Sequence, residues 1–189
     1  MRYAATFSLI FVLFFSTTLL SQKYLNSDNV LVETEWNGVM FGSDKTLMEN
    51  LAQASTFTET GVILKMYSEK LFKEGEMYTV FVAEDTSYKS LPEETYKSLF
   101  ETGHRLERFF TFYVVPGRLD SYSLKKAIEK NGGAIRVKTL NGEDLGVKEI
   151  DGALVLFDSD QNIATITAAN FYHNQGFFHI VDGLVFPSE

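Results

Sequence analysis

The sequence contains no cysteine, and this absence removes several kinds of chemistry at once. Without cysteine there is no disulfide, no thiolate nucleophile, no paired-cysteine metal site and no lipid-modified cysteine at a mature N-terminus. A domain of this size does not require such links, because one packed core is large enough to be stable alone. The chain also has no N-x-[ST] glycosylation sequon.

Histidine is scarce, and the motifs of common enzymes are missing. The sequence has no G-x-S-x-G elbow, no H-E-x-x-H metal motif and no glycine-rich phosphate loop. Its histidines are His104, His173 and His179, and the last two lie across Gly176 from each other. We expect a structural His179 and an exposed His173 rather than a metal pair. The sequence therefore predicts no enzyme, no cofactor and no metal.

Positive charge is in deficit. Lysine and arginine number 17 against 25 aspartates and glutamates, which gives a formal net charge of −8. Nucleic acids and anionic bilayers both bind through basic surfaces, so the composition argues against either as a partner.

A long apolar run is also lacking. Residues 4–20 are apolar but interrupted by serine and threonine, and they are shorter than the ~20 residues that span a bilayer. This pattern predicts a secretory signal peptide over residues 1–21, and no stable membrane span after its cleavage. An uncleaved anchor is the alternative, because Leu19-Leu20-Ser21 is a poor cleavage site.

Aromatic residues, by contrast, are plentiful: 17 phenylalanines and nine tyrosines supply a large core for one domain. The most apolar segment of this expected core lies near the end of the sequence. Residues 177–186 are almost continuously apolar, which is typical of a central strand covered on both faces. Gly176 and Pro187 mark its two ends, and we expect His179 and Asp182 to be hydrogen-bonded locally.

The periodicity changes along the chain from helical to alternating. We expect a helix capped by Ser43 or Asp44, a second up to Gly75, and later helices over residues 92–100, 105–112 and around Leu124. Strands are expected at residues 78–82, 135–139, 145–147, 153–157 and 163–168, followed by the terminal strand. Asp85 is expected to cap the helix that follows the first strand. Helices first and strands later indicate an α+β domain.

Three segments resemble the motifs of the fasciclin (FAS1) domain family, and the resemblance covers residues 43–187. Residues 79–88 match the first motif, although a proline and a threonine of the family pattern are lost. Residues 112–117 match the central motif without its histidine, and residues 176–187 match the closing motif. The residues that carry the match are Thr79, Phe81, Asp85, Tyr113, Pro116, Gly117, Gly176, His179, Asp182 and Pro187.

The resemblance implies a β-wedge of about seven strands with helices packed around one end. It also implies a secreted, extracellular or periplasmic adhesion module that binds a cell-surface or matrix protein or a glycan. The predicted organisation is a signal peptide (1–21), an N-terminal extension that docks loosely (22–42) and a fasciclin domain (43–189). Asn170-Phe171 stands where animal members carry an Asp-Ile pair tied to integrin recognition, so the resemblance does not extend to integrins.

A second hypothesis stays open: a small-molecule carrier or hydrolase with a site near Tyr113, His179 and Asp182. A ligand-sized pocket lined by these residues would favour it. We expect Trp36 to anchor the extension to the domain surface rather than to stack on a sugar. The turn at residues 158–162 lacks the glycine and the glutamate of a calcium loop, so we expect a polar hairpin turn.

Overall fold

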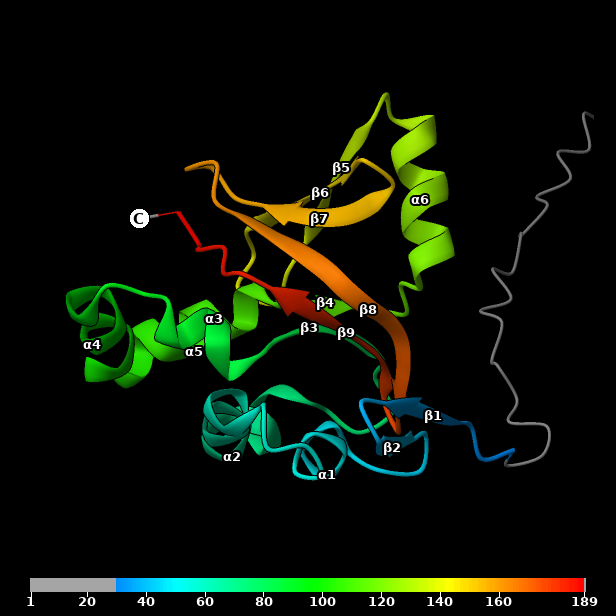
Figure 1. Ribbon diagram of the computed structural model, residues 1–189, viewed down its shortest axis with the longest axis horizontal. Helices are drawn as coiled ribbons and strands as arrows, with labels where there is room; N and C mark the ends of the chain where they lie inside the picture. Colours follow the sequence, from blue (N-terminus) through cyan, green and yellow to red (C-terminus); the bar gives the residue numbers. More distant parts are fainter. Residues whose placement is uncertain (1–29, 189) are drawn as a thin grey trace, which may run out of the picture. The chain divides into compact units, whose positions relative to one another are not determined.

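The computed structural model describes residues 30–188, and the chain from Leu31 onward forms one unit (Figure 1). The predicted signal peptide lies outside the described residues. The strands are β1 (Glu33–Trp36), β2 (Val39–Gly42), β3 (Tyr78–Ala83), β4 (Val114–Pro116), β5 (Ala134–Lys138), β6 (Asp144–Ile150), β7 (Ala153–Phe157), β8 (Ile163–His173) and β9 (Gly176–Asp182). The helices are α1 (Leu47–Leu51), α2 (Thr58–Leu71), α3 (Asp85–Lys89), α4 (Glu93–Glu101), α5 (Gly103–Phe112) and α6 (Ser121–Lys130).

Seven strands form one mixed sheet in the order β4-β3-β9-β8-β7-β6-β5. Strands β3 and β9 are parallel, and every other neighbouring pair is antiparallel. The two edges approach each other, because the N–H of Leu140, just after β5, donates to the carbonyl of Val114 in β4 at 2.8 Å. The sheet is therefore nearly a barrel with helices around it. The predicted α+β class and the predicted number of about seven strands are confirmed.

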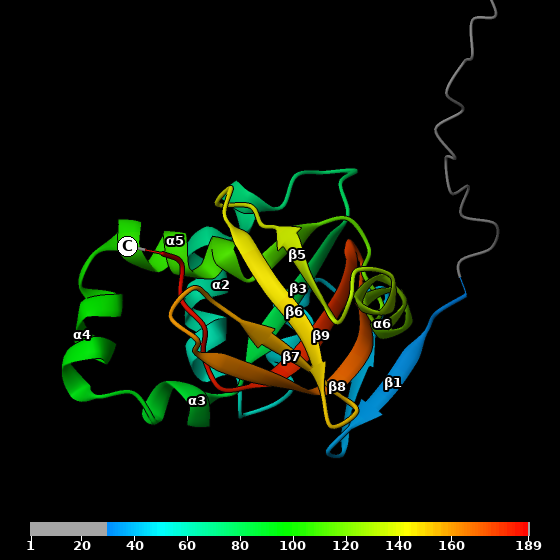
Figure 2. The same ribbon diagram turned by 90° about the horizontal axis from the view of Figure 1, so that it is seen from above.

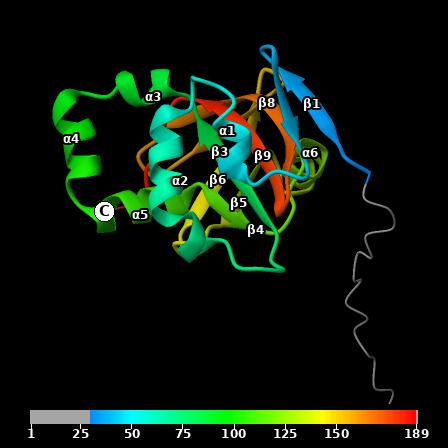
Figure 3. The same cartoon turned by 90° about the horizontal axis from the view of Figure 1, so that it is seen from below.

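The terminal strand β9 lies inside the sheet, between β3 and β8, as its apolar sequence predicted. Its residues are buried up to Val181, and all six residues of β3 are buried. Figure 3 shows α1 and α2 beside these two strands when the molecule is seen from below. Leu51, Ile63 and Leu64 supply the helical side of this core.

Residues 31–42 do not dock loosely, and this expectation was wrong. Strands β1 and β2 pair as a hairpin, and Phe41 is only 1% exposed, with its ring against those of Phe171 and Phe178. Trp36 is half-buried, 5.3 Å from the ring of Phe57. The fully buried Asn50 fixes the hairpin, since its side chain accepts from the N–H of Gly42 and donates to the carbonyl of that residue.

The expected caps of two helices were also misplaced. The cap of α1 is Thr46, which exchanges hydrogen bonds with Glu49 in a capping box. Ser43 is instead used by the hairpin, where its hydroxyl accepts from the N–H of Val32 at 3.0 Å. Asp85 begins α3, but its carboxylate serves the start of α2: it accepts from the Thr58 hydroxyl and from the N–H of Glu59. A carboxylate there satisfies a free N–H group and faces the positive end of the helix dipole.

Strand β8 is longer than the sequence indicated, and it continues past residue 168 to His173. Its pairing with β9 shifts register twice between Ile166 and Phe171, and Asn170 there has a positive φ of 68°. These bulges break the alternation of apolar and polar residues, which hid the second half of the strand.

Candidate functional site: a motif framework and an open cleft

The motif residues of the sheet form a hydrogen-bonded framework. Thr79 in β3 is fully buried; its hydroxyl donates to the carbonyl of Gly117 at 2.9 Å and accepts from the N–H of Leu119 at 2.8 Å. Gly117 has a φ of 95°, which glycine adopts readily, and it follows the exposed Pro116 at the end of β4. The first motif thus holds the loop that the central motif begins.

His179 in β9 joins the closing motif to the same loop. Its side chain is fully buried, and Nε2 lies 2.7 Å from the carbonyl oxygen of Leu119. Its Nδ1 accepts from the N–H of Asn170 at 3.2 Å, so Nε2 carries the proton and donates. The imidazole stacks on Phe81, with ring centroids 5.5 Å apart. Burial lowers the pKa of His179, and the neutral ring serves as a fixed bridge between β8, β9 and the loop.

Asn170 is a framework residue that the sequence reasoning missed. Its side-chain oxygen accepts from the N–H of Ser121 and its amide donates to the Ser121 hydroxyl, both at 2.8 Å. Asparagine tolerates the positive φ found here, and this tolerance was the available signal. Asn170 thus fixes the start of α6 through Ser121.

Gly176 lets β9 begin directly beside β3. Its φ is 138°, and a Cβ atom at this position would lie 2.1 Å from the carbonyl oxygen of Tyr78. No side chain fits at that distance without moving the backbone.

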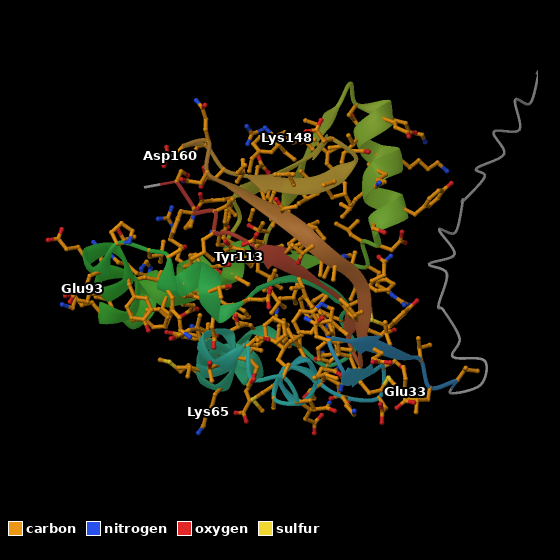
Figure 4. All side chains as sticks on the ribbon, viewed as in Figure 1. Glu33, Lys65, Glu93, Tyr113, Lys148 and Asp160 are labelled. Carbon is orange, nitrogen blue, oxygen red and sulfur yellow. The ribbon has the colours of Figure 1, made fainter. Side chains whose placement is uncertain are left out.

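Tyr113 holds the segment that follows β9. It is 3% exposed, and its hydroxyl donates to the carbonyl of Val185 at 3.0 Å and accepts from the N–H of Val185 at 2.7 Å. Burial raises the pKa of the Tyr113 hydroxyl well above its usual value, so the group stays neutral. In Figure 4 Tyr113 lies in the interior of the domain, whereas Glu93 and Asp160 lie at its surface.

The structure does not assemble Tyr113, His179 and Asp182 into one site. Tyr113 bonds to Val185, whereas His179 bonds to Leu119 and Asn170. Asp182 is exposed at the end of β9, contrary to the expectation of a strand covered on both faces up to Pro187. Burial of Glu84, with the charges of Asp182 and Asp85, raises the pKa of the Glu84 carboxyl. The carrier or hydrolase hypothesis required a pocket lined by Tyr113, His179 and Asp182. None of these three residues lines either of the two clefts described below.

The expectation that His173 is exposed was wrong, because it is 4% exposed at the end of β8. Within residues 30–188, no group of three histidine, aspartate or glutamate side chains is placed to hold a metal ion. In the same range, no helix combines the length and hydrophobicity needed to cross a bilayer.

The turn at residues 158–162 is built on a buried aspartate. Asp158 accepts from the N–H groups of Asp160 and Asn162, both at 2.9 Å, and also from the N–H of Phe186 at 2.8 Å. The polar turn predicted there is present, and it also fixes the last described segment of the chain.

A cleft of about 860 Å³ opens between α4, α5, this turn and the end of the chain. We call it the α4–α5 cleft. Leu99 and Phe109 are buried at its floor, with the partly buried Phe186 beside them. Its other lining residues are Glu94, Thr95, Ser98, His104, Arg105, Arg108, Asp160, Asn162 and Pro187. Pro187 is thus the one motif residue that reaches this cleft.

The class that this architecture defines is a single α+β domain whose sequence motifs serve its framework. The fasciclin domain family model matches residues 51–187, which is most of the chain, so the protein belongs to the fasciclin domain family.

The fold agrees with a solved structure. The chain is similar to a FAS1 domain pair from the insect cell adhesion molecule fasciclin I, at 13% identity and a TM-score of 0.64. The similarity covers 82% of this chain and 66% of that one. No curated protein matches the sequence. Fasciclin domains are associated with cell adhesion, are generally non-catalytic and are typically extracellular.

Proposed function

We propose that this chain is a secreted, non-catalytic adhesion domain that binds a segment of a cell-surface or matrix protein in the α4–α5 cleft. The proposal rests on the lining of the cleft, which combines buried apolar residues at its floor with polar and charged residues at its opening. The chain also belongs to a family associated with cell adhesion. An apolar floor inside a polar, charged rim is the arrangement that protein-recognition sites share.

The rim offers both signs of charge to a partner. Glu94 and Arg105 are exposed on α4 and α5, and Asp160 is exposed on the β7–β8 turn. Arg108 is engaged within the domain, since it donates to Glu143 at 2.8 Å. Charged rim groups set the orientation and the association rate of a partner, while the floor buries its apolar side chain.

The family and the sequence both support the extracellular location in this proposal. Fasciclin domains are typically extracellular, and residues 1–21 have the pattern of a secretory signal peptide.

Cell attachment to surfaces coated with the mature protein tests the proposal, together with binding to a panel of purified matrix proteins. Thr95 is exposed on α4 and lines the cleft, so Thr95→Arg places a long side chain in the opening. We expect attachment and affinity to fall by about tenfold or more.

Thr86→Arg is the matched control, because Thr86 is exposed on α3 and does not line the cleft. It introduces the same side chain and charge, and it should bind as the wild type does. Equal binding by the Thr95→Arg variant would refute the cleft as the site. A wild-type protein that binds neither cells nor matrix proteins would refute the adhesion function itself.

A further inference from the structure

Strands β5 and β6 carry a row of cations on the face turned away from α6. Lys125 of α6 lies 3.8 Å from Glu149, so the odd-numbered residues of β6 point toward that helix. Side chains alternate along a strand, and Lys148 therefore points to the opposite face. Arg136 pairs in register with Gly146 and lies on that same face. Figure 2 shows β6 and β7 from above with no helix drawn over them.

Phe157 organises these cations. Residues 146 and 157 are register partners, and a Cβ atom at Gly146 would lie 2.4 Å from the Phe157 ring, so the ring rests directly on the glycine. The guanidinium of Arg136 lies 5.4 Å from the ring centroid and the ammonium of Lys148 lies 5.0 Å from it. One partly exposed ring thus holds two positive groups by cation–π attraction.

The two cations lack an acidic partner. Among residues 30–188, no carboxylate lies within salt-bridge distance of Arg136 or Lys148, in a chain of net charge −8. The neighbouring Lys138 pairs with Asp144 at 2.8 Å. Two positive charges held near one ring repel each other, and a bound anion removes that cost.

A notch of about 310 Å³ adjoins these residues. Arg136 and Lys138 line it together with Ser159 and Ser188. Two carboxylates also line the notch, and both are engaged: Asp144 pairs with Lys138. Glu143 accepts from Arg108 and from both the N–H and the hydroxyl of Ser188. The Ser188 hydroxyl is used by Glu143 and Lys138 by Asp144, so the notch presents the Arg136 guanidinium and the Ser159 hydroxyl to a ligand.

We propose that this basic strip, made of Arg136, Lys138, Lys148 and Phe157, binds an anionic polysaccharide that carries carboxylate or sulfate groups along its chain. A repeating anion needs spaced cations on an open surface, whereas a protein partner needs a desolvated apolar anchor, which the α4–α5 cleft supplies and the strip does not. The net negative charge does not prevent such binding, because charges beyond about 8 Å are largely screened at physiological salt. The strip adds a second ligand class to the proposed adhesion role.

Binding of the mature protein to heparin and to polygalacturonate, with dextran as the neutral control, tests the proposal. We expect saturable binding to at least one of the charged polymers and none to dextran. Affinity should fall steeply as salt rises from about 50 mM to about 500 mM, because the contacts are between exposed charges. The double variant Arg136→Ser, Lys148→Ser should bind about tenfold more weakly or worse.

The matched control is Lys65→Ser, Lys89→Ser, which removes two exposed lysines from α2 and α3 and leaves the same net charge. In Figure 4 Lys65 and Lys148 lie on opposite sides of the domain. The charge-retaining variant Arg136→Lys, Lys148→Arg should keep most of the affinity, which separates loss of charge from loss of folding. Thr95→Arg should leave polysaccharide binding unchanged, so this result is independent of the cleft.

Equal weakening by the two serine variants would overturn the proposal, because net charge would then explain it. Absence of binding to both charged polymers at low salt would overturn it as well. Tighter binding to poly-glutamate or to vesicles of phosphatidylserine than to either polysaccharide would assign the strip to an acidic protein or to a membrane surface instead.

Discussion

The burial of His173 makes the stability of the domain sensitive to mild acid. The side chain is 4% exposed, and within the described chain its Nε2 atom has no hydrogen-bond partner. Its Nδ1 accepts from the N–H of Gln175 at 3.3 Å, and the Phe72 ring lies 6.4 Å away. Burial lowers the pKa of His173 from 6.5 to about 4, against a smaller opposing effect of the Tyr78 and Phe177 backbone.

The sign of the effect follows from proton binding. Below pH 6.5 the unfolded chain takes up a proton at this histidine, whereas the folded chain remains neutral until the pH approaches about 4. Acid therefore favours unfolding over this interval. At about 1.4 kcal/mol per pH unit, the fall from 6.5 to about 4 removes about 3 kcal/mol from the free energy of unfolding. Burial lowers the pKa of His179 as well, so this residue acts in the same direction.

Urea unfolding at several pH values between about 4 and 7 isolates the contribution of His173. His173→Gln keeps a hydrogen-bond acceptor but cannot be protonated. The slope of the free energy of unfolding against pH should fall by about 1 kcal/mol per pH unit relative to the wild type. His104→Gln is the control, because His104 is exposed on α5, and it should leave the slope unchanged. Parallel wild-type and His173→Gln curves would refute the reasoning.

Three further substitutions test the framework by thermal or urea unfolding. Gly176→Val should destabilise most, by about 3 kcal/mol or more, because a Cβ atom would lie 2.1 Å from the Tyr78 carbonyl oxygen; an unchanged melting temperature would contradict this contact. His179→Ala should lower the free energy of unfolding by about 1–3 kcal/mol without abolishing partner binding in the folded protein. Loss of binding at unchanged stability would instead make His179 a ligand-contacting residue. Tyr113→Phe should cost about 1–3 kcal/mol, since both backbone groups of Val185 lose their partner, and a neutral result would show that water replaces the hydroxyl.

The order of helices and strands could be predicted because long apolar patterns specify most of it. The continuous apolar run of β9 and the alternation of β5 and β6 each identified a strand at the place where the structure has one. The hairpin β1–β2 and the strand β4 could not be found in this way. Each of these three strands has only three or four residues, which is too few for a periodic pattern to show. Their pairing with a neighbouring strand, rather than their own sequence, defines them.

The framework residues were identifiable, but their partners were not. Thr79 and His179 stood out by resemblance, yet both meet in the loop around Leu119, which is 40 and 60 residues away in sequence. His173 was assigned the wrong exposure because a polar side chain in a strand is buried or exposed according to its face, and the bulges of β8 shift that face. Asp182 is exposed because it is the last residue of β9, where the buried run of that strand ends.

The α4–α5 cleft was beyond the reach of the sequence for a different reason. Its floor combines Leu99, Phe109 and Phe186 from three separate segments. None of these forms a motif, and a patch with an apolar centre and a charged rim exists only once the segments are folded together.

The most direct test of the adhesion function is site-specific photo-crosslinking on cells that the protein binds. A photoreactive amino acid replaces Thr95 in the cleft, and in a parallel variant it replaces Thr86 on α3. We expect that position 95 forms a covalent product with one cell-surface or matrix protein, that excess unlabelled wild type abolishes it, and that position 86 forms none. A product at position 86 and none at position 95 would contradict the central claim and place the adhesive surface elsewhere on the domain.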